Sequence, residues 1–225
     1  MERTASPFRS ALWAVLAKDG LCELRSRYAF STLLMFALVT LSSVSMTLAS
    51  MTLSPEMGAA LLWIILFFCA MAGLSRVFEQ EQEAGTIFAL RLYVPGQAVL
   101  FGKLLFNLGM LILLTILVVP LFVLFLNVDI PFDFSLPLIL LAGNLGIAAA
   151  STLTAAIVAK TQGKSALFAV LTFPVLLPQF LAVISATVKV LSHGELLLGE
   201  WFFMIGYDVV LCIGASILFD YLWYD

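Results

Sequence analysis

The sequence alternates between long apolar runs and short polar stretches. A membrane helix needs about 20 residues, because the bilayer core is about 30 Å thick and each residue rises about 1.5 Å. Six runs are long enough, and the predicted spans are Ala29–Leu53, Met57–Ser75, Val99–Leu126, Leu136–Ala159, Ser165–Leu191 and Trp201–Trp223. The pattern therefore predicts an all-α integral membrane protein of about six transmembrane helices, with residues 1–225 forming a single membrane domain.

Composition agrees with lipid as the surrounding solvent. Hydrophobic residues make up 63% of the chain and charged residues 11%, and the mean hydropathy is +1.12. Soluble domains contain about 45–50% apolar and about 25% charged residues. The first apolar run, residues 29–53, is also longer than the core of a secretory signal, which has about 7–15 residues. We therefore interpret it as a membrane anchor.

Basic residues lie almost entirely on one side of the predicted spans. Lys189 is alone on the other side, while ten of the eleven share one side: Arg3, Arg9, Lys18, Arg25, Arg27, Arg76, Arg91, Lys103, Lys160 and Lys164. Cytoplasmic loops carry the excess of Lys and Arg in membrane proteins. Both termini are therefore predicted to be cytoplasmic, which agrees with an even number of spans.

The region before the first span has its own helical pattern. Apolar residues recur there at helical spacing, with charged residues away from them: Phe8, Leu12, Val15 and Leu16, against Arg9, Lys18 and Asp19. This period predicts an amphipathic helix lying in the inner membrane interface. The alternative is a flexible basic tail.

Residues Arg76–Ala98 form the one substantial hydrophilic stretch after the first span. Glutamates alternate with glutamines at Glu79, Glu81 and Glu83, and Gly85–Thr86 then separates them from an apolar segment. On a helix Glu79 and Glu83 share a face that excludes Glu81, which argues against a metal site. We interpret the acidic residues as a solvated or partner-facing surface and the segment as more than a linker.

Catalytic chemistry is not evident in the sequence. It contains no nucleophile–base set, no metal-ligand spacing, no phosphate-binding glycine loop and no basic patch for nucleic acid. The single histidine, His193, fits a polar loop residue better than a haem or metal ligand. Cys22, Cys69 and Cys212 are predicted to be free thiols, since none is placed for a disulfide in an outer loop.

Three features inside the spans qualify this picture. Asp208 lies within the last span, where an ionisable group is costly and needs a partner or water; a later helix start would instead make it interfacial. Pro174 and Pro178 should bend the fifth span, which suits either a moving helix or static packing. A small-residue face in the fourth span predicts close helix contact: Gly143, Gly146, Ala148, Ala149, Ala150 and Ala155.

Several motifs together resemble the haem exporter protein B family. The charged approach to the first span resembles that family at Lys18, Asp19, Glu23, Arg25 and Arg27. The cytoplasmic signature is similar at Arg76, Phe78, Glu81, Gly85, Thr86, Leu92, Pro95, Gly102, Lys103 and Asn107. Thr161, Gly163, Lys164 and Leu167 before the two prolines, and Asp208, also match the pattern. The loop 191–200, Tyr93 and Gln97 depart from it.

The resemblance implies an ABC-type permease domain in a bacterial inner membrane, supporting haem delivery to the periplasm for c-type cytochrome biogenesis. It implies three partners: a cytoplasmic ABC ATPase, a tryptophan-rich haem-handling membrane subunit and a second copy of the chain. Haem would be the substrate, ATP would bind the partner, and this chain alone would hold no cofactor. The ATPase-coupling residues would be Arg76, Phe78, Glu79, Glu81, Glu83, Gly85 and Thr86.

Two alternatives remain. The chain could be a permease half for another substrate, such as a lipid or drug, with the same coupling segment. It could instead be a proton-coupled secondary transporter that uses Asp208 and needs no ATPase.

The basic asymmetry predicts that Ser54 and Ser135 face outside while Gln82 and Gln162 face the cytoplasm. Single cysteines at these sites, in a chain without its native cysteines, would be treated with a membrane-impermeant maleimide in intact cells. Only the first two should be labelled. Labelling at Gln82 or Gln162 would overturn the orientation.

Overall fold

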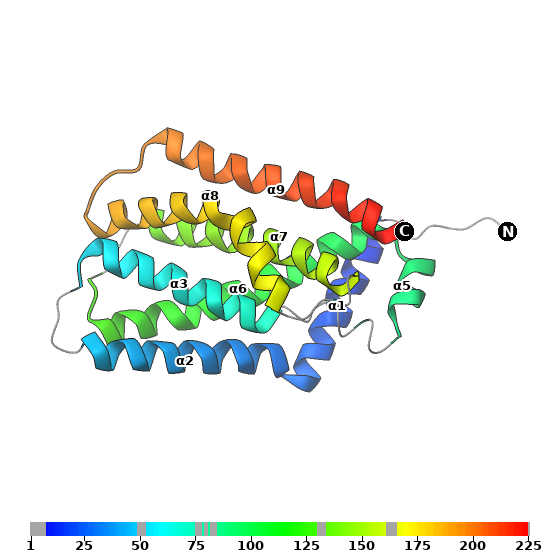
Figure 1. The fold of residues 1–225 in the computed structure, drawn as a ribbon, viewed down its shortest axis with the longest axis horizontal. Helices are drawn as coiled ribbons and strands as arrows, with labels where there is room; N and C mark the ends of the chain where they lie inside the picture. Colours follow the sequence, from blue (N-terminus) through cyan, green and yellow to red (C-terminus); the bar gives the residue numbers. More distant parts are fainter. Residues whose placement is uncertain are drawn as a thin grey trace.

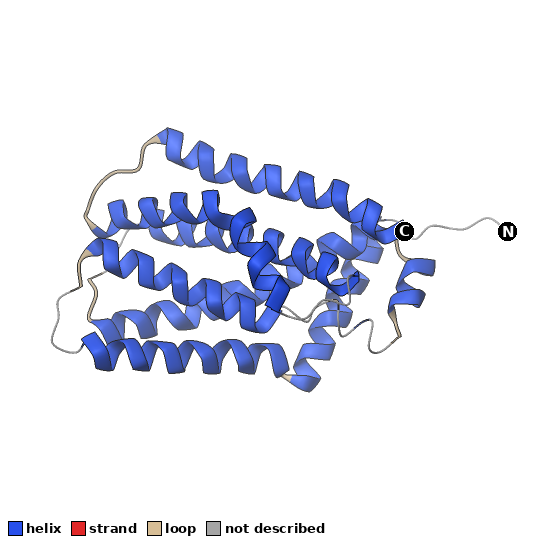
Figure 2. Cartoon of the chain, in the orientation of Figure 1, coloured by secondary structure: helices blue, strands red, loops and turns tan. Residues whose placement is uncertain are grey.

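The computed structural model describes residues 8–48, 53–74, 78, 81, 85–129, 134–160 and 166–224. In this part of the chain the regular structure is entirely helical (Figure 2). The helices are α1 (Phe8–Ser26), α2 (Tyr28–Leu48), α3 (Pro55–Leu74), α5 (Ile87–Tyr93), α6 (Gly96–Leu126), α7 (Ser135–Lys160), α8 (Ala166–Leu191) and α9 (Leu198–Tyr224).

Six of these helices are long and apolar enough to cross a membrane: α2, α3, α6, α7, α8 and α9. They run side by side as a bundle (Figure 1), which confirms the predicted fold class. The helices lie at the predicted spans, although α6 already begins at Gly96 and α9 at Leu198. The last residues of the first predicted span, 49–52, lie outside the described residues.

The bundle separates charge between its two ends. The start of α1 and the end of α9 lie at the same end (Figure 1). The described basic residues of α1, of the turn before α2, of the start of α6, and of the ends of α5 and α7 gather there, because successive spans alternate in direction. At the other end Lys189 pairs with Glu200 at 2.6 Å. The described basic residues that were predicted to share one side of the membrane therefore lie together at one end of the bundle.

Helix α7 occupies the centre of the bundle and packs against α3, α6, α8 and α9. Its small-residue face is buried as predicted, at Gly143, Gly146, Ala148, Ala149, Ala150 and Ala155. The closest contact is between Gly143 and the indole of Trp63 on α3, where a Cβ would lie 2.0 Å from Cη2. Small residues let helices approach closely in lipid, where association depends on packing.

Polar side chains also join the helices within the bundle. The pairs, each between two helices, are Asn107–Thr152 (2.8 Å), Asn144–Thr115 (2.9 Å), Trp63–Thr187 (2.9 Å) and Thr154–Thr172 (2.7 Å). Such hydrogen bonds average about 0.6 kcal/mol each in membranes. They therefore fix the register of packed helices more than they stabilise the bundle.

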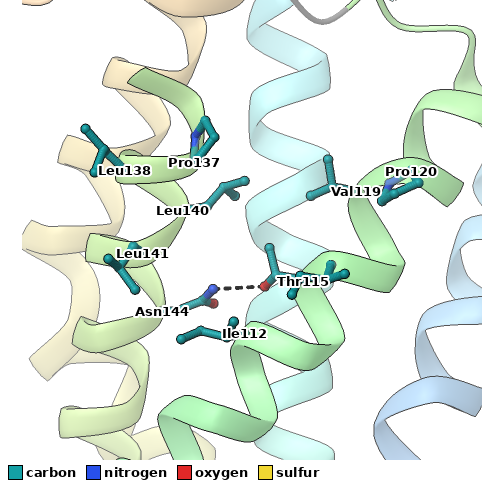
Figure 3. A pocket seen from close by; sticks show the side chains of 10 residues that line it. Ile112, Thr115, Val119, Pro120, Pro137, Leu138, Leu140, Leu141 and Asn144 are labelled. Carbon is teal, nitrogen blue, oxygen red and sulfur yellow. Dashed lines mark hydrogen bonds between the residues drawn. The ribbon is translucent and has the colours of Figure 1, made fainter. Parts of the chain in front are cut away.

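Proline residues shape two of the helices. Helix α8 contains Pro174 and Pro178 and changes direction along its length (Figure 1), as predicted for missing amide donors. Helix α6 contains Pro120, which borders an open apolar groove of about 470 Å³ between α6 and α7. The hydrogen-bonded pair Asn144–Thr115 lies in this groove (Figure 3).

Gly143→Ala should destabilise the fold, because its Cβ would clash with the Trp63 ring at 2.0 Å and overpacking costs about 1–3 kcal/mol. Thermal unfolding of the purified chain in detergent would measure the loss. Gly109→Ala is the matched control, since nothing lies within 4 Å of its added Cβ. Equal unfolding temperatures for the two variants would contradict the proposed α3–α7 contact.

Candidate functional site

Helix α1 crosses the charged end of the bundle and packs against α6. Its buried side contains Ala11 and Val15, and a Cβ on Gly102 of α6 would lie 2.9 Å from Val15 Cγ1. Trp13, on the other side, is 63% exposed. The predicted helix is thus confirmed, and its apolar positions divide between a contact with α6 and an exposed face.

The turn from α1 to α2 keeps the two helices at a sharp angle. Arg27 has a left-handed backbone, with φ of 51°, which ends α1. The Glu23 carboxylate then accepts a hydrogen bond from the Phe30 amide at 2.8 Å. This bond satisfies one of the free amides at the start of α2 and fixes the place of α1 across the bundle.

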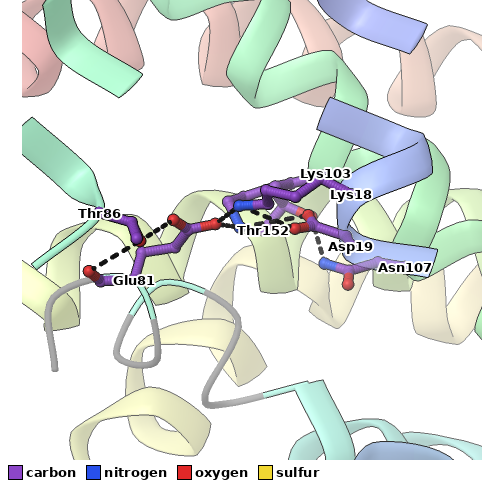
Figure 4. A network of polar contacts seen from close by, with 7 residues as sticks. All are labelled: Lys18, Asp19, Glu81, Thr86, Lys103, Asn107 and Thr152. Atoms are coloured by element: carbon purple, nitrogen blue, oxygen red, sulfur yellow. Dashed lines mark hydrogen bonds and ion pairs between the residues drawn. The ribbon is translucent and has the colours of Figure 1, made fainter. Parts of the chain in front are cut away.

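Four charged side chains meet where α1, the loop after α3 and α6 come together (Figure 4). Lys103 of α6 lies 3.2 Å from the carboxylate of Asp19 and 3.1 Å from that of Glu81. Lys18 pairs with both Glu81 and Asp19. Among the described residues, two cations therefore balance two anions in a cluster that joins three separate segments of the chain.

Burial and ion pairing shift the pKa values of Glu81 and Lys18 in opposite directions. Burial tends to raise the pKa of Glu81, but Lys103, Lys18 and a 2.7 Å hydrogen bond from Thr86 Oγ1 outweigh it and hold the pKa at about 2. Burial likewise tends to lower the pKa of Lys18, whereas its bonds to Glu81 and Asp19 raise it above 10.5. Both groups consequently stay ionised at neutral pH.

A series of ring contacts continues from this cluster to the end of α9. Lys103 Nζ lies over the ring of Phe78 at 5.0 Å, and that ring packs on Phe219 at 5.7 Å. Phe219 stacks on Trp223 at 5.4 Å, and the Arg91 guanidinium lies 5.7 Å from the Trp223 ring centroid. The loop between α3 and α6 is thus attached to α9 as well as to α1 and α6.

Two further features define the loop. A hydrogen bond of 2.9 Å from Gln97 to Asp220 ties the start of α6 to the end of α9. Gly85 has a φ of +67°, a left-handed conformation that glycine adopts without the strain of a Cβ. The described part of the loop is consequently held at several points and turns sharply at an exposed glycine.

The predicted coupling residues differ in their placement. Phe78, Glu81, Gly85 and Thr86 are described, whereas Arg76, Glu79 and Glu83 lie outside the described residues. For Glu81 the prediction of a solvated or partner-facing surface is wrong, because the residue is only 6% exposed. It turns inward since two lysines distant in sequence meet there.

Lys18, Asp19 and Lys103 were not predicted as site residues. A signal was present in Lys103, a lysine within the first turns of an apolar span. A buried ammonium needs carboxylate partners, and Lys103 is 1% exposed. The sequence alone does not say which carboxylates these are, because they come from α1 and the loop.

A second polar group lies deeper in the bundle. Asp208 is 3% exposed inside α9, as expected for an acid within the span. A Cβ on Gly146 of α7 would lie 2.9 Å from both Asp208 Oδ1 and Gln179 Cγ. Asp208 Oδ1 and both amide atoms of Gln179 have no hydrogen-bond partner among the described residues. No pattern along the chain predicts that Gln179 lies here.

The other polar candidates lie apart from these sites. His193 is exposed, with φ of 56°, in the turn that ends α8. In the described part of the chain, no group of three or more His, Cys, Asp or Glu side chains could hold a metal ion. Cys22, Cys69 and Cys212 are free thiols, as predicted.

Comparison with known proteins gives one match. A family model described as CcmB protein matches residues 10–216, which is most of the chain. No curated protein and no solved structure matches it. The matched range includes the charge cluster, the loop and Asp208.

Glu81→Gln and Lys103→Met should each lower the free energy of unfolding by about 3–5 kcal/mol, because each leaves an opposite charge buried without its partner. The double variant should lose less than the sum of the two losses. Chemical unfolding in detergent would measure this cycle. Additive losses would contradict direct pairing.

The low pKa of Glu81 determines the pH range over which Glu81→Gln should cost stability. The folded pKa of Glu81 is about 2, below its ordinary 4.5, so its contribution is present above about 4.5 and is lost as pH falls toward 2. The stability difference between wild type and Glu81→Gln should therefore stay constant from pH 8 to pH 5.

Proposed function

Because this chain belongs to the CcmB family, the membrane components of the haem-exporter ABC transporter for cytochrome c maturation, we propose that it couples ATP hydrolysis on a separate cytoplasmic subunit to movement of its own helices. The chain is a multi-pass membrane protein. Its membrane in this proposal is the bacterial inner membrane, with the charged end of the bundle in the cytoplasm.

The attachment of the loop to three helices supports this coupling role. Through Glu81 and Phe78 the loop contacts α1, α6 and α9. A partner that displaced the loop would act on the ends of all three helices together. Coupling needs contacts whose arrangement differs between two states, and in this proposal the contacts that change are those of the charge cluster at the base of the loop.

The docking surface for the ATPase is the exposed part of the loop. Gly85 and Thr86 are exposed, and Leu92 and Tyr93 of α5 are 67% and 80% exposed. Glu81 acts indirectly, by holding this surface to α1 and α6. The loop as a whole couples the ATPase to the helices, and the ATPase contacts the loop residues that are exposed.

The remaining partners follow from the same family role. A second copy would complete the permease, and a tryptophan-rich membrane subunit would handle haem. Haem is the substrate of the assembly, ATP binds the ATPase, and this chain alone holds no cofactor. Its one histidine, His193, is exposed just after the C-terminal end of α8, whereas the coupling loop lies at the other end of the bundle. His193 and the coupling residues are therefore too far apart to bind one haem together.

A second candidate function rests on Asp208. A buried acid beside Gln179, with an oxygen that has no hydrogen-bond partner among the described residues, is a feature of proton-linked transporters. In that case the chain would work with a proton gradient and without an ATPase. A permease half for a lipid or drug would keep the ATPase and change only the substrate.

Tyr93→Arg and Gly85→Pro should leave the chain inserted and abundant while releasing the ATPase or leaving it bound but idle, so that cytochrome c assembly fails. The first alters an exposed docking residue, and the second forces φ near −65° where it is +67°. Co-purification in mild detergent, ATPase activity and haem attachment to a c-type cytochrome would be measured.

Arg25→Gln, an exposed site on α1, serves as the matched control and should retain assembly. Because Glu81 is buried between lysines of its own chain, an acidic change on the ATPase should not rescue Glu81→Arg. The secondary-transporter alternative predicts the reverse pattern, in which Asp208→Asn abolishes function and the loop variants matter little. Full assembly and normal ATPase association in both loop variants would disprove the coupling proposal.

A further inference from the structure

A small cavity lies beside the loop at the charged end of the bundle. Its volume is about 20 Å³, and its lining includes Arg91 of α5, Lys160 of α7 and Trp223 of α9. Apolar residues from the same helices, together with Phe78, complete the wall. The cavity therefore lies where the ends of two membrane spans meet the short helix α5.

The polar side chains among the described lining residues, Arg91, Lys160 and Trp223, are all hydrogen-bond donors. Arg91 Nε and Trp223 Nε1 are buried and have no hydrogen-bond partner among the described residues. Lys160 adds a second positive charge, and the described residues of the lining include no acidic side chain. A buried donor without an acceptor costs about 1–3 kcal/mol, so the arrangement favours a ligand that brings an acceptor.

The size of the cavity restricts how such a ligand fits. About 10–15 Å³ is enough for one water-sized atom, and the cavity of about 20 Å³ therefore has room for a single oxygen. A phosphate would place one oxygen between the indole and guanidinium donors and keep its other oxygens outside the cavity, and Lys160, which also lines the cavity, adds a positive charge. The stacking of Arg91 on Trp223 at 5.7 Å holds the guanidinium in place for this contact.

We propose that Arg91, Lys160 and Trp223 form a binding site for the phosphate of an anionic phospholipid in the inner leaflet. The neighbouring residues favour a lipid over a free ion. Trp223 lies at the end of a membrane span, where tryptophan side chains mark the interface. Arg91 and Lys160 line the same cavity, and the anionic inner leaflet attracts basic residues near its surface.

A bound lipid would fasten α5 to α7 and α9 from outside, beside the internal charge cluster. The described loop is joined to α1 and α6 by ion pairs, but its link to α9 through Arg91 is a ring contact alone. The phosphate would add hydrogen bonds to that link. The site depends on the position of the charged end at the inner leaflet and on no particular transported substrate.

The experiment would titrate the purified full chain, freed of lipid in mild detergent, with short-chain phosphatidylglycerol or phosphatidylcholine. Native mass spectrometry would count bound lipids, and thermal unfolding would report stabilisation. Phosphatidylglycerol should bind more tightly and raise the unfolding temperature. Arg91→Gln and Lys160→Gln should each weaken its binding about fivefold, the equivalent of about 1 kcal/mol per charge.

Trp223→Phe tests the buried donor, because it removes the indole N–H and retains an aromatic ring under Arg91. It should also weaken phosphatidylglycerol binding about fivefold, as expected for about 1 kcal/mol from one hydrogen bond. Arg25→Gln, which removes a charge from α1 at the same end of the bundle, should leave binding unchanged. Circular dichroism would confirm that each variant keeps its helices.

Three results would overturn the proposal. Equal binding of the two lipids would show that the headgroup charge is not recognised. Stabilisation by inorganic phosphate alone to the same extent would identify a free anion as the ligand. Unchanged lipid binding by Arg91→Gln, with loss of the ATPase from the complex, would assign these donors to a partner carboxylate. Lipid binding by the chain alone is measured without the ATPase, so failure of the coupling proposal is a separate result.

Discussion

The buried ammonium of Lys103 is the constraint on which the cytoplasmic end of this protein depends. A charge placed in the first turns of a membrane helix has to be paired, because its desolvation costs several kcal/mol. The carboxylates that pair with it among the described residues come from α1 and from the loop after α3. Lys18 then completes the balance by pairing with both carboxylates. One buried lysine thus determines where a helix and a loop, distant in sequence, are placed.

The rest of the bundle is stabilised differently. Between the spans there is little hydrophobic driving force, because lipid is as apolar as the side chains. Close packing takes its place, as at Gly143 against Trp63, with hydrogen bonds such as Asn107–Thr152 to set the register. The frame around α7 is consequently dense, whereas the charged end is joined by ion pairs and ring contacts. This difference suits a protein whose loop is moved by a partner.

The two candidate functions rest on different parts of the molecule, the charged end and the densely packed bundle. The loop surface is exposed and is connected to three helices, which fits coupling to an ATPase in an ABC transporter of the CcmB family. Asp208 and Gln179 lie inside the dense frame and have polar atoms without hydrogen-bond partners among the described residues. A shift of α8 or α9 would change the surroundings of this polar pair, because Gln179 is on α8 and Asp208 on α9.

The sequence by itself determined the six spans, the helix before them and the segregation of basic charge. These follow from local pattern, since the bilayer thickness and the need to satisfy every backbone hydrogen bond leave few alternatives. Only the tertiary structure decided that Glu81 turns inward, that Gln179 lies near Asp208 and that Arg91 stacks on Trp223. Lys18 and Glu81 are 63 residues apart, and Gln97 and Asp220 are 123 apart. Such contacts depend on how helices pack in three dimensions, and no periodicity along the chain records that packing.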